Sequence, residues 1–131
     1  MSTERCTFVA LFALCSLTAG RPAAAHHSFT MFDTTNRVTV TGVVASCEWI
    51  NPHVIVEIDG AEVDGGLKRW TVELSSPGAL QRLGWSHDDL RYRSRITAVV
   101  YPLKSGAPGG LLVQATLADG RVLGNSGPAP R

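Results

Sequence analysis

Hydrophobic and polar residues alternate along much of the chain after residue 37, with the period of two that is typical of β-strands. The first alternating run extends from Val38 to about Trp49, and Gly42 within it predicts a bulge or a sharp coil. Asn51-Pro52 ends this run, because proline has no N–H to donate to a neighbouring strand. The pattern predicts four further strands, over residues 53–59, 69–74, 96–101 and 111–117.

One helix signal interrupts the alternation between the third and fourth expected strands. Ser76 is a candidate N-cap, Pro77 suits the first helical position, and Gly84 is a natural helix stop. A second single turn is expected to end at Leu90. The protein is therefore predicted to be mainly β, a five-stranded OB-like Greek-key barrel with one short helix between strands three and four. An open sandwich of the meander type is the alternative architecture.

The first 25 residues have the features of a cleavable signal peptide. Arg5 precedes an apolar run over residues 7–17, and small residues end the segment at Ala25. The run is shorter than the ~20 residues of a membrane span. We therefore expect a signal peptide over 1–25, a barrel domain over 26–123 and a disordered Gly- and Pro-rich tail over 124–131. The predicted location is periplasmic or secreted, with no transmembrane segment in the mature chain.

Charge and cysteine content narrow the function classes. Without the leader, 12 basic and 11 acidic residues become 10 and 10, and such a balance argues against a nucleic-acid partner. Cys47 is the only cysteine outside the leader, so no disulfide is expected, and an apolar filler is its more common role. No nucleophile elbow, zinc-protease helix or phosphate loop is present, so no catalytic residues are assigned and an enzyme is not expected.

Histidines provide the candidate chemistry. Cleavage after Ala25 would give His26 a free α-amine, and the amine, His26, His27 and His53 could together present several nitrogen ligands. Such a set suits Cu(II) best among the divalent first-row ions. Alternatively, the terminal histidines are solvated or pack with the arm on the barrel, and His53 hydrogen-bonds a carbonyl at a strand end. A copper redox enzyme is a minor further alternative.

Three other groups of side chains have two interpretations each. Trp49, Trp70 and Trp85 could form a stacking platform, but core packing is the more common role of such residues. The basic run over residues 91–95 could bind an anion or a lipid headgroup, and a solvated loop is the simpler interpretation. Glu48 could add an oxygen ligand to the histidines if it points to the same side.

Several motifs together resemble a known family. They are His26-His27-Ser28-Phe29 after the leader, Trp49-x-Asn51-Pro52-His53 after the first strand, and Gly84-Trp85 after the helix. The chain resembles the domain-of-unknown-function family 6152 of small exported bacterial proteins. The resemblance implies export and a small β-rich domain, and it carries no established activity. The chain departs from the family pattern over residues 91–95, where such proteins usually have a Pro-Gly-Asp-like turn.

Two function hypotheses follow. The first is an exported, non-enzymatic β-barrel binding module that holds a transition metal, copper, through His26, His27 and His53. The second is a periplasmic or envelope module for protein interaction or stress, which uses the barrel face and its tryptophans without a metal. The partner is thus a metal ion or a periplasmic protein.

Overall fold

The computed structural model describes residues 29–61 and 66–125, and these residues form a mainly β domain. The strands are β1 (Val38–Glu48), β2 (Ile55–Ala61), β3 (Leu67–Glu73), β4 (Arg95–Pro102), β5 (Gly109–Leu117) and β6 (Val122–Gly124). The helices are α1 (Pro77–Arg82) and the two short 3-10 helices η1 (Phe29–Met31) and η2 (His87–Leu90). Helix α1 lies between β3 and β4, as the sequence predicts.

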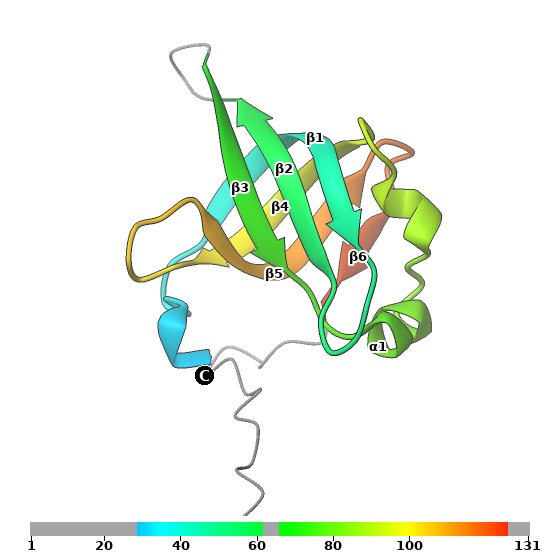
Figure 1. Ribbon diagram of the computed structural model, residues 1–131, viewed down its shortest axis with the longest axis horizontal. Helices are drawn as coiled ribbons and strands as arrows, with labels where there is room; N and C mark the ends of the chain where they lie inside the picture. Colours follow the sequence, from blue (N-terminus) through cyan, green and yellow to red (C-terminus); the bar gives the residue numbers. More distant parts are fainter. Residues whose placement is uncertain (1–28, 62–65, 126–131) are drawn as a thin grey trace, which may run out of the picture.

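The strands form a closed barrel (Figure 1). They are hydrogen-bonded in the order β3-β2-β1-β4-β5-β6, and a parallel pairing of β3 with β5 joins the two sides of the sheet. This pairing rules out the open sandwich and confirms the predicted five-stranded OB-like barrel. β6 is an additional short strand on the later half of β5.

β1 pairs with two different strands, one along each half of its length. Its first half pairs with β4 and its second half with β2, and Gly42 lies opposite both Ile96 and Gly60. A side chain at Gly42 would collide with the carbonyl oxygen of Asp59, so glycine permits this close approach. The register shift of β1 lies slightly later, between Val44 and Ser46.

One continuous cluster of buried side chains fills the barrel. Alternate residues of the strands point inward, as the period of two predicts, and residues around α1 and η2 complete the cluster. Its members are Val40, Val44, Val54, Val56, Ile58, Val72, Leu74, Leu80, Trp85, Leu90, Ile96, Ala98, Val100, Leu112, Ala115 and Leu117. We call this set the interior cluster.

Residues at both ends of α1 determine where the helix begins and ends. The Ser76 side chain accepts a hydrogen bond from the N–H of Ala79, and Gly84 follows the helix with a φ of +92°. Leu80 of α1 is fully buried in the interior cluster. The Ser76 and Gly84 geometry confirms the predicted cap and stop, and Leu80 shows that the helix packs against the barrel interior.

A second, smaller group of buried side chains lies outside the barrel. Phe32 packs with Tyr101 and Leu111, and Leu103 and Val113 contact the same group. We call these five residues the outer cluster. It attaches the N-terminal arm, residues 29–33, to the end of β4 and the start of β5, as η1 in Figure 1 illustrates.

Backbone hydrogen bonds fix the same arm. The N–H of Asp33 donates to the Pro102 carbonyl over 2.8 Å, and the N–H of Lys104 donates to the Met31 carbonyl over 2.9 Å. The arm is therefore part of the folded domain.

Asn125 links Ser75, shortly after the end of β3, to β5 by hydrogen bonds. Its side chain accepts from the N–H of Ser75 over 2.8 Å and donates to the carbonyl of Leu112 over 2.9 Å. Its own N–H donates to the carbonyl of Val113. Asn125, in the segment predicted as a tail, is therefore hydrogen-bonded to the strands. The rest of the predicted tail, 126–131, lies outside the described residues.

Candidate functional site

His53 lies at the entrance to β2, directly after the turn that contains the cis Asn51-Pro52 peptide bond. Its neighbour Val54 extends the β2–β3 ladder by two further bonds, to the carbonyl of Ser75 and from the N–H of Leu74. These bonds hold the backbone on which the His53 imidazole is mounted.

The partner of the His53 imidazole is Glu73, the last residue of β3. His53 Nδ1 lies 2.7 Å from Glu73 Oε1, and the two side chains are 33% and 15% exposed. The sequence pattern alone did not predict this pair. The structure therefore gives the His53 side chain a carboxylate neighbour, in addition to the strand-end position that the sequence predicts.

The contact determines which imidazole nitrogen can act as a ligand. An ionised carboxylate only accepts hydrogen bonds, so Nδ1 carries the proton and the lone pair of neutral His53 lies on Nε2. Histidines that bind metals commonly donate their other N–H to a carboxylate in this way, which orients the ring and makes it more basic.

The arm and the His53–Glu73 pair share the outer surface of the barrel. Glu73 is opposite Leu111 in the parallel β3–β5 ladder, and Leu111 packs with Phe32 in the outer cluster. A continuous path of contacts therefore leads from the arm through Leu111 and Glu73 to His53. His26 and His27, the other predicted ligands, lie outside the described residues.

Glu48 lies on the same outer face but is farther away. It is opposite Ile55 on β2, which in turn is opposite Glu73 on β3. Two strand spacings, roughly 10 Å, thus separate Glu48 from Glu73. Within residues 29–61 and 66–125, no three His, Cys, Asp or Glu side chains group closely enough to hold a metal ion.

Cys47 has the apolar role that the sequence favours. It is half-buried against the interior cluster. Burial, with a smaller contribution from Glu48, raises the pKa of its thiol to about 11. Cys47 is therefore protonated at neutral pH and is a poor nucleophile or metal ligand.

The three tryptophans do not form an exposed stacking platform, because Trp85 is buried. Trp85 is only 3% exposed, and its Nε1 donates to the Gly124 carbonyl over 2.8 Å. Trp49 and Trp70 pack partly against the interior cluster, and Trp49 meets His87 edge to face with ring centroids 6.0 Å apart. Core packing, the more common role, accounts for Trp85 in full.

Comparison with known protein families shows to which family the chain belongs. Residues 13–114 match the family described as "Family of unknown function (DUF6152)". The chain belongs to this family. Comparisons with curated proteins and with solved structures give no match. Among the described residues, no helix is long and apolar enough to cross a membrane.

The turn between η2 and β4 has an uncommon backbone conformation. The Ser94 N–H donates to the Arg91 carbonyl over 2.9 Å, and Arg93 has a φ of +66°. A positive φ is the conformation that favours glycine. The turn is held to β1 because the Arg93 N–H donates to the Val44 carbonyl over 2.7 Å. It projects Arg91, Tyr92 and Arg93 into solvent.

Proposed function

We propose that this DUF6152 protein is an exported, non-enzymatic binding module that holds a transition metal, copper, through His26, His27 and His53. One observation carries the proposal: Glu73 Oε1 lies 2.7 Å from His53 Nδ1, an arrangement that leaves Nε2 of the ring as the nitrogen available to a metal. Export to the periplasm is part of the proposal and is supported by the leader-like segment 1–25.

The path of the arm supports a meeting of the three histidines. Two residues lie between His26 and Phe29, and the three steps from one to the other span at most about 10 Å when extended. The arm packs on Leu111, which is the ladder neighbour of Glu73. The proposal therefore requires residues 26–28 to continue over the outer face of β5 toward Glu73.

The donor types favour copper. Cleavage after Ala25 would create an α-amine with a pKa near 7.7–8.0, which loses its proton to a metal more readily than lysine does. The amine and the imidazoles of His26, His27 and His53 are nitrogen ligands, which suit Cu(II). No residue of the described chain is assigned a catalytic role.

A copper titration of the chain that begins at His26 tests the proposal. Glu73→Gln is expected to weaken copper binding by ~10–100-fold, because it changes only the carboxylate that orients His53. His53→Ala should weaken it at least as much. His87→Ala is the matched control, because His87 is exposed on η2 and contacts Trp49 rather than Glu73.

A second comparison tests the amine. A chain that retains Ala25 before His26 keeps every histidine but moves the α-amine by one residue, so its copper affinity should fall by at least tenfold. Equal affinities for this chain, the His53→Ala variant and the parent would contradict the metal proposal.

The alternative proposal is a protein-interaction module that uses the barrel face without metal. The burial of Trp85 removes one of the three tryptophans on which that idea relied. Copper binding that is lost in Glu73→Gln and retained in His87→Ala would decide for the metal.

A further inference from the structure

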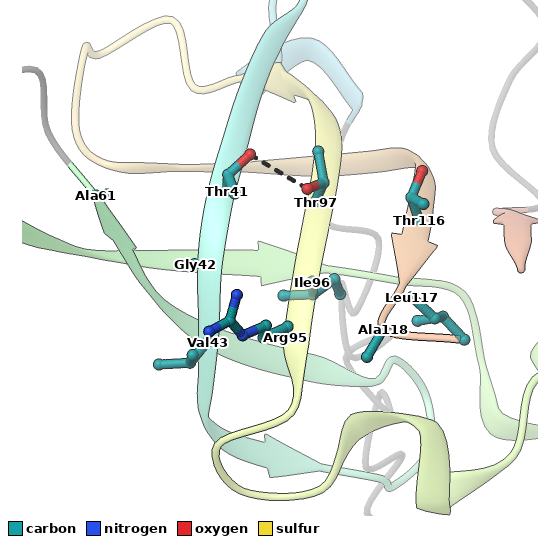
Figure 2. A pocket seen from close by; sticks show the side chains of 10 residues that line it. All are labelled: Thr41, Gly42, Val43, Ala61, Arg95, Ile96, Thr97, Thr116, Leu117 and Ala118. Carbon is teal, nitrogen blue, oxygen red and sulfur yellow. Dashed lines mark hydrogen bonds between the residues drawn. The ribbon is translucent and has the colours of Figure 1, made fainter. Parts of the chain in front are cut away.

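A shallow hollow of about 400 Å³ lies on another part of the barrel, between β1, β4 and the end of β5 (Figure 2). Its volume falls within the ~300–1,000 Å³ of ordinary small-molecule sites. Its lining combines hydroxyl groups, small apolar side chains and a single charged residue. The lining residues are Thr41, Gly42, Val43, Ala61, Arg95, Ile96, Thr97, Thr116, Leu117 and Ala118.

Strand register aligns three hydroxyls across this hollow. Thr97 on β4 is opposite Thr41 on β1 and opposite Thr116 on β5, so the three side chains form one row on the outer face. Figure 2 shows Thr41 and Thr97 turned toward each other, and their Oγ1 atoms are 3.2 Å apart. Each hydroxyl retains further capacity to donate or accept.

Arg95 supplies the charge beside this row. It lies opposite Val43 in the β1–β4 ladder, one outward position before Thr97. Figure 2 shows its side chain extending toward β1, beside Val43 and Gly42. Ala118 and Ala61 flank the hollow with small side chains, which keep it open.

The carboxylates nearest to Arg95 are already paired with other arginines. Asp59, which is opposite Val43 on β2, receives two hydrogen bonds from Arg69, over 2.7 and 3.0 Å. Arg95 also lines a second hollow, which contains three more acids. Their partners are Arg91 for Asp88, and Arg121 for both Asp89 and Asp119.

Among the described residues, the side chain of Arg95 has no hydrogen bond or ion pair, and it is the only ionisable side chain that lines the 400 Å³ hollow. Its guanidinium presents five N–H donors in a planar fork that matches the oxygens of a carboxylate or phosphate. The hollow therefore offers donors and positive charge without a competing acid in its lining.

We propose that this hollow binds a small molecule through an oxyanion, a carboxylate or a phosphate, which pairs with Arg95 and accepts from the hydroxyls of Thr97 and Thr116. The apolar surface of Val43 and Leu117 contacts the rest of the ligand. This site is independent of the metal proposal, because it shares no residue with the His53–Glu73 surface.

An amide NMR titration tests the site with inorganic phosphate and with acetate, each against chloride at equal ionic strength. We expect saturable shifts at Thr41, Thr97 and Thr116 with at least one of the two anions. The tighter probe identifies the chemical source as a phosphate ester or a carboxylate. Shifts that do not saturate with either anion, or that spread over all exposed arginines, would overturn the proposal.

Matched variants locate the anion. Arg95→Gln should weaken binding by ~10-fold or more, because it removes the charge-assisted pair. Thr97→Val keeps the β-branched shape and should weaken it by a smaller factor. Arg93→Gln is the control, because Arg93 is an exposed arginine two residues away that does not line the hollow. Equal losses in Arg93→Gln and Arg95→Gln would show nonspecific attraction to the basic loop and refute the site.

Discussion

The two halves of β5 differ in how they are covered. The first four residues, Gly109 to Leu112, are all buried, whereas the last four, Gln114 to Leu117, alternate between exposed and buried. Both halves contribute to the interior cluster, the first through Leu112 and the second through Ala115 and Leu117. Only the first half also has a covered outer face, because the arm packs on it through Phe32.

This difference teaches how a strand of a small barrel acquires a second buried face. An unbroken apolar stretch indicates a strand covered on both sides, and strict alternation indicates one covered side. Residues 109–113 of β5 have the first pattern and residues 114–117 have the second. The proposed metal site borders the covered half, since Glu73 is opposite Leu111.

Truncation of two neighbouring leucines of β5 is expected to give the largest change in stability and to compare its two covered faces directly. Leu112 points into the interior cluster and Leu111 into the outer cluster, and both are almost fully buried. Leu112→Ala should lower the free energy of unfolding by about 4 kcal/mol, because the surrounding strands cannot close the cavity. Leu111→Ala should cost about 2 kcal/mol, because the arm can move in.

Urea denaturation of both variants measures the two values. Equal losses would mean that the outer cluster is as rigid as the interior one. In that case, the distinction between the two halves of β5 would be structural only and not energetic.

Truncation of Phe32 should uncover the first half of β5. We expect Phe32→Ala to lower the free energy of unfolding by about 2 kcal/mol. This value corresponds to the buried apolar surface of one aromatic side chain, with no added cost for a cavity. Hydrogen exchange should accelerate at the amides of Asp33 and Lys104, which bond across the arm. The Leu74 amide, which bonds to Val54 inside the barrel, should change less.

Phe29→Ala is the matched control for this prediction. Phe29 is the other phenylalanine of the arm, and 53% of it is exposed. Its truncation should leave both stability and amide exchange near the parent values. Faster exchange at Leu74 than at Asp33 in the Phe32 variant would contradict a separately attached arm.

The interior face of the barrel was predictable because alternation is a local property. The alternation over residues 53–59 matches the buried positions of Val54, Val56 and Ile58, and Ser76 and Gly84 correctly place the helix between β3 and β4. Strand ends differ by one or two residues, since the last pairs of a ladder depend on the partner strand.

Contacts between distant strands were not predictable in the same way. Alternation gives the face of a side chain but not the register of the strand pair, so it could not bring His53 to Glu73. Asn125 was missed for the same reason, because its partners Ser75 and Leu112 lie 50 and 13 residues away. The metal role of His26 and His27 stays a prediction.

Asn125 bonds to Leu112 and Val113, between the two halves of β5. Its substitution should have the next largest effect on the free energy of unfolding. Asn125→Ala leaves the Ser75 N–H and the Leu112 carbonyl without this partner, which should cost about 1–3 kcal/mol. Asn125→Asp keeps the acceptor and should cost less. Gln114→Ala, at an exposed position of β5, is the control and should change stability by no more than ~0.5 kcal/mol.

The smallest expected effect is a weakening of the arm by acid. The carboxylate of Asp33 accepts hydrogen bonds from the Thr35 hydroxyl, the Asn36 amide and the Thr35 N–H, and these bonds lower its pKa from 3.8 to about 2. The unfolded chain binds this proton first, so the stabilisation is complete above pH ~4 and is lost as the pH falls toward 2.

An NMR titration of Asp33 should therefore have a midpoint near 2, and exchange at the Lys104 amide should rise as the pH falls through that range, after correction for the intrinsic rate. Asp33→Asn should remove this pH dependence while Val44, whose N–H bonds to Ser94 on the opposite side of the barrel, behaves as in the parent. A midpoint at the ordinary value of 3.8 would mean that the turn after the arm is open in solution. The covered half of β5 would then depend on the Phe32 side chain alone.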